Sequence, residues 1–156
     1  MNRKNEGFTL VEILIVVIIL GILAAIVIPQ FTEASNDARE SALASDLQTV
    51  RSQVELFKVQ HCELLPGDDG SGSFTAARFG QHLTQKTDQD GTINASGQYG
   101  PYLQKFPTNP FASANADVVE IVTSDPNGSQ ADGDPGWWFN SNTGKFGANT
   151  TDHVDM

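Results

Sequence analysis

The chain has 156 residues, with 9 Lys and Arg against 19 Asp and Glu, and a formal net charge of −10 at pH 7. This acidity argues against binding nucleic acid through its phosphates, which requires clustered Lys and Arg side chains. A single cysteine, Cys62, excludes an intrachain disulfide; we expect it to be a small buried residue, and pairing between chains is the alternative.

The first feature along the chain is an apolar stretch from Phe8 to Ile28, in which Glu12 is the only ionisable side chain. As a helix rising about 1.5 Å per residue it spans about 30 Å, the thickness of the hydrocarbon core of a bilayer. The stretch is too long for an ordinary secretion signal, and its small residues lie inside the run rather than after it. We therefore expect residues 8–28 to cross a membrane.

Basic residues flank this stretch unequally. Arg3 and Lys4 precede it, whereas only Arg39 follows shortly after it. Because positive charge stays on the cytoplasmic side, we expect a single pass with the N-terminus cytoplasmic and residues 29–156 outside as one small domain.

The junction from Gly7 to Glu12 reads G|FTLVE. It resembles the processing motif of the type IV pilin and type II secretion pseudopilin family, and the chain is most similar to the major, G-type pseudopilins. The resemblance implies that a prepilin peptidase removes residues 1–7 as a leader after Gly7 and methylates the new amine of Phe8. It also implies a helical homopolymer with residues 8–28 at its centre, and Pro29 falls where the family places a helix-bending proline.

Glu12 also has a physical interpretation. A charge inside a membrane helix costs several kcal/mol unless it finds a partner. The new amine of Phe8, from its own or a neighbouring subunit, is the obvious partner after cleavage. Alternatively, the carboxylate extends to the lipid headgroups at the nearby end of the helix.

The helical pattern continues beyond Pro29, which should kink the helix as it leaves the membrane. Apolar residues recur three and four positions apart, as on one face of an amphipathic helix. This stripe consists of Leu43, Leu47, Val50, Val54 and Phe57. We expect the helix to run to about Leu64, where Pro66-Gly67 ends it.

The rest of the chain predicts short elements. Residues 75–86 read as a helix capped by Ser73, with Ala76, Phe79 and Leu83 facing inward. Residues 118–122 read as a strand, and residues 137–147 as a hairpin around the turn 141–144. Three short antiparallel strands against a long helix give an α+β fold, which is also the pilin-like roll of the family.

An acidic segment, residues 124–134, lies between the first strand and the hairpin. Calcium takes six to eight oxygen ligands, and Asp125, Asp132 and Asp134 with nearby carbonyls could supply most of them. The segment is not an EF-hand, since Gln130 and Gly136 occupy the positions of its required Gly and Glu. The resemblance also implies a calcium ion in such a loop. The alternative is an acidic turn, because Asp, Asn, Gly and Pro favour turns in any case.

Together these features predict a structural subunit of a type II secretion pseudopilus, not an enzyme. The partners implied by the resemblance are further copies of the chain, minor pseudopilins, the inner-membrane assembly platform and the prepilin peptidase. The implied location is the bacterial inner membrane and then a periplasmic filament. The alternative is a type IV or competence pilin for adhesion or DNA uptake; the acidic charge disfavours the DNA role and the missing disulfide the adhesive one.

Overall fold

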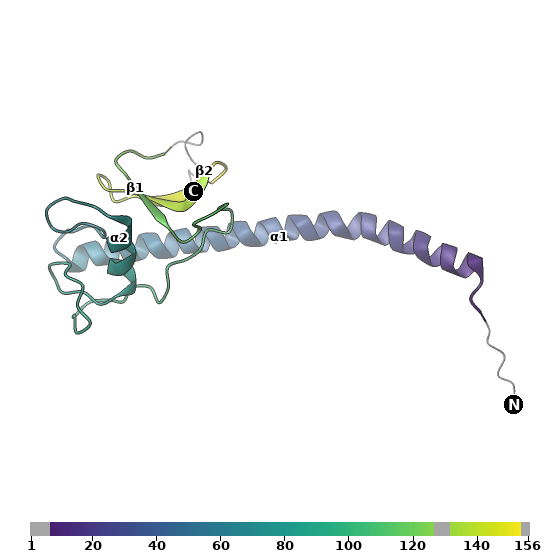
Figure 1. Cartoon of the computed structure of the whole chain (residues 1–156), viewed down its shortest axis with the longest axis horizontal. Coiled ribbons are helices and arrows are strands. Elements are labelled where there is room, and N and C mark those ends of the chain that lie inside the picture. The colour runs from purple at the N-terminus through teal and green to yellow at the C-terminus, as the bar shows by residue number, and fades with distance from the viewer. Residues whose placement is uncertain (1–6, 127–131, 154–156) are drawn as a thin grey trace, which may run out of the picture. The chain divides into compact units, whose positions relative to one another are not determined.

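The computed structural model describes residues 7–126 and 132–153, and only the backbone of Asp132 and Gly133. Two compact units make up the chain, Met1–Ala38 and Arg39–Met156, which we call the N-terminal unit and the body. The described elements follow in the order α1, α2, β1, β2 and β3 (Figure 1).

Helix α1 runs from Leu10 to Gln60. In the body its buried residues are Leu43, Leu47, Val50, Val54 and Phe57, which confirms the predicted apolar stripe. The stripe forms one cluster with apolar side chains of α2 and the three strands. This half of α1 is therefore held by core packing.

The end of α1 differs from the prediction, because the helix stops at Gln60 rather than near Leu64. Cys62 and Glu63 take positive φ angles of 55° and 68°. The Glu63 amide then donates to the carbonyl of Lys58 at 2.9 Å, a bond that closes a helix end. The turn is thus complete before Pro66 is reached. It also leaves Cys62 exposed, so the expectation of a buried thiol is wrong.

Helix α2, Ala76–Thr84, begins one residue later than predicted. Its N-cap is Thr75, whose side chain accepts a hydrogen bond from the amide of Arg78, so the expected cap at Ser73 is wrong. Phe79 and Leu83 are fully buried, as their spacing predicts. The helix therefore contributes one short apolar face to the core of the body.

The sheet contains β1 (Val119–Val122), β2 (Asp132–Asn140) and β3 (Phe146–Thr150), in that order. Strands β2 and β3 are antiparallel, which confirms the hairpin. Strands β1 and β2 are parallel, with Val119 opposite Trp137 and Val122 opposite Asn140, so the all-antiparallel expectation is wrong. Alternation of apolar and polar residues in a strand does not indicate in which direction its partner runs.

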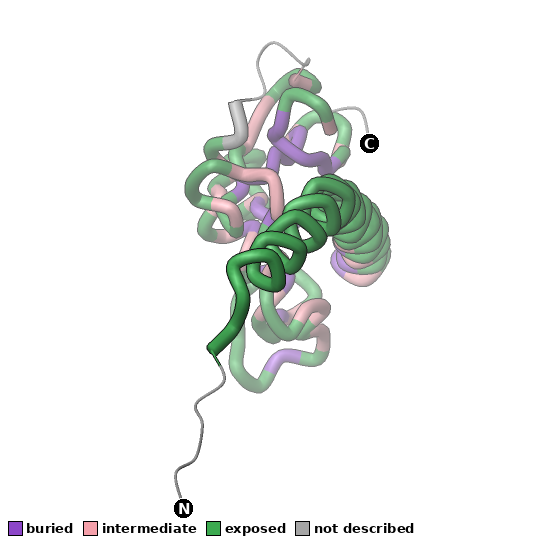
Figure 2. Tube along the Cα trace, turned by 90° about the vertical axis from the view of Figure 1, so that its right-hand side faces the viewer, coloured by how far each residue is buried: buried purple, intermediate pink, exposed green. Residues whose placement is uncertain are grey.

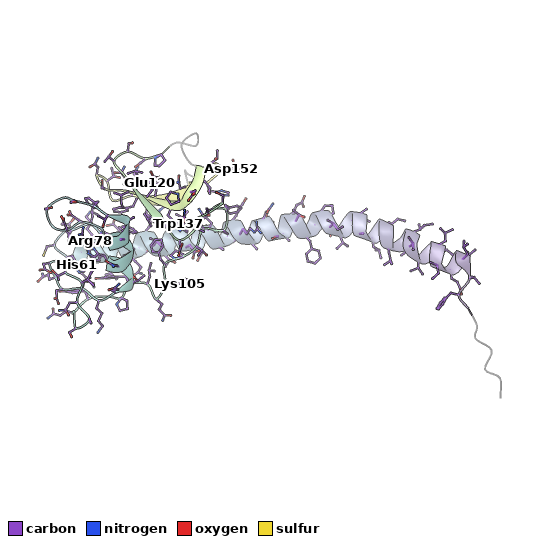
Figure 3. All side chains as sticks on the ribbon, in the orientation of Figure 1. His61, Arg78, Lys105, Glu120, Trp137 and Asp152 are labelled. Carbon is purple, nitrogen blue, oxygen red and sulfur yellow. The ribbon has the colours of Figure 1, made fainter. Side chains whose placement is uncertain are left out.

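One face of the sheet packs on the C-terminal half of α1. Trp137, labelled in Figure 3, is fully buried, and its ring lies 5.3 Å from that of Phe146. The Arg51 guanidinium Nε donates to the Phe146 carbonyl at 2.8 Å and so ties α1 to β3. The fold is α+β: a long helix, apolar at its N-terminal end, packed on a small mixed sheet.

Candidate functional site

Within the N-terminal unit, residues 8–28 present an apolar surface. Its large hydrophobic side chains from Phe8 to Ile28 are exposed, from 42 % at Val27 to 85 % at Phe8, and Figure 2 shows this half of α1 exposed throughout. By length and composition this helix could cross a membrane. A surface of this kind is stable only in lipid or against other apolar helices.

The only charge on this surface belongs to Glu12, and Thr9 binds it. The Thr9 amide and hydroxyl both donate to Glu12 Oε2, at 2.8 and 2.7 Å. In return, the Glu12 amide donates to Thr9 Oγ1 at 3.3 Å. This reciprocal arrangement is a capping box, in which Thr9 is the N-cap and Glu12 the third helical residue. The pattern T-x-x-E was readable in the sequence, but the family motif drew attention to Glu12 alone.

In the capping box the partner of the Glu12 carboxylate is Thr9, not the predicted amine of Phe8. Two donors from its own chain satisfy Glu12 while Phe8 is still joined to Gly7 through a peptide bond. The predicted pair between the Glu12 carboxylate and a free Phe8 amine therefore stays a prediction. Cleavage after Gly7 would leave both members of the capping box in the chain.

Pro29 lies inside α1 and does not end it. The hydroxyl of Thr32 donates to the Ile28 carbonyl at 3.2 Å, one residue before the proline. A proline has no amide hydrogen, so the helix lacks one backbone bond here. The predicted kink at this position stays a prediction.

The second candidate site begins at Asp125, just beyond β1. Its Oδ1 accepts a hydrogen bond from the Asn140 amide at 2.5 Å, and its Oδ2 pairs with Lys145 Nζ at 2.7 Å. These contacts, that of Lys145 first, lower the pKa of the Asp125 carboxyl below its ordinary value of 3.8. Asn140 ends β2 and Lys145 immediately precedes β3, so Asp125 meets the hairpin turn.

Asp134 lies at the other end of the strand pair. Its Oδ1 accepts a hydrogen bond from the Asn115 amide at 2.7 Å, in the segment before β1. The part of β2 between Asp134 and Asn140 covers roughly 20 Å at about 3.3 Å per residue. Since calcium binds oxygen at about 2.3–2.6 Å, one ion does not contact both Asp125 and Asp134 in this arrangement.

Asp132, the third expected ligand, begins β2, but its side chain is outside the described part of the chain. Within the described residues, no three His, Cys, Asp or Glu side chains form a group that could hold a metal ion. The calcium site stays a prediction.

Comparisons with known proteins bear on the N-terminal site first. Residues 2–28 match the family model described as the prokaryotic N-terminal methylation motif. The chain is 28 % identical to type II secretion system core protein G of Pseudomonas aeruginosa, over 72 % of each chain. It is 25 % identical to the protein of that name from Dickeya chrysanthemi, over 88 % of this chain and 89 % of the relative.

This chain is a homologue of the type II secretion system core proteins G and carries the prokaryotic N-terminal methylation motif.

Another relative of this G-type homologue is prepilin peptidase-dependent protein D of Escherichia coli K12. It is 34 % identical over 61 % of this chain and 65 % of the relative. No solved structure matches. The names of the relatives describe a secretion system component and a protein that depends on a prepilin peptidase.

Two histidines of the G-type homologue are buried, and both serve the core. The rings of His61 and His82 stack on Phe57, with ring centroids 3.8 and 5.0 Å from it. His61 contacts the Phe57 carbonyl at 2.8 Å and the Thr87 hydroxyl at 2.9 Å, while His82 Nδ1 accepts the Gly67 amide at 3.2 Å. Burial, the dominant cause, lowers the pKa of His82 from 6.5 to about 4. The spacing of these residues in the sequence did not predict that their rings stack.

Proposed function

We propose that this chain is the structural subunit of a type II secretion pseudopilus and assembles through residues 8–28. The observation that carries the proposal is the exposed apolar surface of residues 8–28, which contains a single acid, Glu12, near its start. The methylation motif covers the same residues, and core G proteins recur among the relatives. The alternative of an adhesive or DNA-uptake pilin is not favoured by these relatives.

The subunit first resides in the bacterial inner membrane. Residues 8–28 span the bilayer, and Arg3 and Lys4 hold the N-terminus on the cytoplasmic side. The body folds in the periplasm. The Glu12 carboxylate enters the membrane with Thr9 as its partner, which reduces the cost of placing it there.

Processing then prepares the subunit for assembly. A prepilin peptidase cleaves after Gly7 and methylates the amine of Phe8. This amine is a stronger partner for the Glu12 carboxylate than a neutral hydroxyl, because both groups are charged. A neighbouring subunit's amine draws Glu12 into an intermolecular pair while the apolar helices bury one another. Minor pseudopilins and the inner-membrane assembly platform supply the start and the growth of this polymer.

Imaging of filaments tests the role of Glu12. We expect cells that overexpress the chain to form filaments visible by negative-stain electron microscopy, and Glu12→Ala and Glu12→Gln to abolish them. The matched control is Glu33→Ala, which removes an exposed acid of α1 beyond Pro29. Filaments of normal abundance from Glu12→Gln would show that the charge has no role in assembly.

Mass spectrometry of the membrane fraction tests the processing step separately. The expected mature chain begins at Phe8 and carries one additional methyl group. A chain recovered with residues 1–7 intact from cells that form filaments would contradict the proposed processing.

A further inference from the structure

The turn that joins β2 to β3 also holds the chain that leaves β1. The Ser141 amide donates to the Val122 carbonyl at 2.9 Å. The Asn142 side-chain amide donates to the Thr123 carbonyl at 2.8 Å. Asp125 completes the contact through Asn140 and Lys145. We call Asp125, Asn140 and Lys145 the clamp.

Asn140 gives the clamp its geometry. Its side chain is 2 % exposed, and its Oδ1 accepts the amides of Asn142 and Thr143, at 2.9 and 3.2 Å. The turn fixes the Asn140 side chain in this way, and its Nδ2 then points at the Asp125 carboxylate. The carboxylate therefore meets a donor whose position is already set.

Lys145 supplies the positive charge. Its Nζ lies 2.7 Å from Asp125 Oδ2, so both carboxylate oxygens are in use, one by each partner. A calcium ion at Asp125 would have to displace this ammonium group. Asp134 could not assist, because it contacts Asn115 at the far end of the strand pair.

We propose that Lys145 takes the place of a metal ion in this chain. Its ammonium group joins the segment after β1 to the hairpin turn, and the sheet stays folded without calcium. The clamp joins two parts of one sheet. Because Lys145 holds the segment after β1, the stability of this segment does not depend on the concentration of metal ions around the protein. This proposal and the calcium prediction exclude each other.

Thermal unfolding of the full-length chain in detergent micelles tests the proposal. The two tryptophans, Trp137 and Trp138, both lie in β2, so their fluorescence reports on the sheet. We expect the same midpoint in excess EDTA and in millimolar calcium chloride. In EDTA, Lys145→Met lowers the midpoint by about 2–5 °C, and Lys145→Arg restores most of it because the charge returns. A rise of the wild-type midpoint in calcium would overturn the proposal.

Two further variants identify the contact. Asp125→Asn should lower the midpoint in EDTA as Lys145→Met does, and the double variant should fall no further than either single variant. The control is Lys105→Met, since Lys105 is an exposed lysine on a loop of the body, far along the chain from the clamp (Figure 3). Equal midpoints for wild type and Lys145→Met, or additive losses in the double variant, would overturn the clamp.

Discussion

Glu12 shows that a charged residue in an apolar helix can be satisfied by its own neighbours in the chain. The sequence predicts that this charge in an apolar helix needs a partner, and that the new amine of Phe8, from its own or a neighbouring subunit, provides it after cleavage. The structure adds a nearer partner, since Thr9 already donates two hydrogen bonds to the carboxylate. Both residues of the capping box lie in the printed sequence three positions apart, so local chemistry alone predicts this contact. The burial of His82 could not be predicted from the sequence, because it depends on the stacking of rings from distant parts of the chain.

The buried His82 predicts how the stability of the body depends on pH. In the folded body its pKa is about 4, whereas the unfolded residue titrates near 6.5. Between these values the unfolded state binds one more proton, so the free energy of unfolding decreases as the pH falls. The contribution is complete above about pH 6.5 and changes by at most about 1.4 kcal/mol per pH unit below it.

Urea unfolding followed by tryptophan fluorescence measures this slope between about pH 7 and pH 4.5. We expect His82→Gln to be less stable at neutral pH and to have a flatter dependence on pH. His153→Gln serves as the control, because His153 stacks on Phe111 near the C-terminus and is only half-buried. If His82→Gln keeps the slope of the wild type, another group is responsible for it.

Among the helices and strands, the features that follow from residue spacing were predicted from the sequence, whereas strand direction and the end of α1 were not. The spacing of five residues from Leu43 to Phe57 was sufficient to place the buried face of α1. The hairpin followed from alternation around a Gly-containing turn. The parallel pairing of β1 with β2 was missed, because nothing in either strand indicates the direction from which the partner arrives. The early end of α1 was missed because two non-glycine residues adopt positive φ there.

The packing of β3 against β2 gives a prediction for one glycine. A Cβ atom added at Gly147 would overlap the Trp138 ring, whose Nε1 donates to the Ala148 carbonyl at 3.1 Å. Gly147→Ala should therefore destabilise the body by about 1–3 kcal/mol through overpacking. Urea unfolding measures the loss. The control is Gly80→Ala in α2, where the added Cβ meets nothing within 4 Å and alanine favours the helix by up to about 1 kcal/mol. If both changes destabilise the body equally, overlap with the Trp138 ring is not the cause of the loss at Gly147.

The whole molecule divides its tasks between two units. Every member of the core cluster comes from Leu43 or later, so the body contains all of its own core. The N-terminal unit has no buried residue among those described, and its apolar surface is of a kind that is stable only in lipid or against other apolar helices. Composition and charge indicated this division from the sequence, because the apolar residues of the first segment show no polar face.

A fragment from Arg39 to Met156 tests the division. We expect it to be soluble and monomeric by size-exclusion chromatography and to unfold cooperatively in urea, with a midpoint close to that of the full chain in micelles. The reason is that the removed residues contribute nothing to the core cluster. Aggregation of the fragment, or a gradual transition without a midpoint, would show that the body needs the first 38 residues to fold.

The start of α1 at Leu10, with its cap on Thr9, has a consequence for the timing of maturation. Every atom that begins the helix lies on the retained side of the proposed scissile bond. Cleavage after Gly7 would therefore add a positively charged amine at Phe8 and leave the first turn of the helix intact. The uncut precursor therefore already contains the complete first turn of the proposed mature helix.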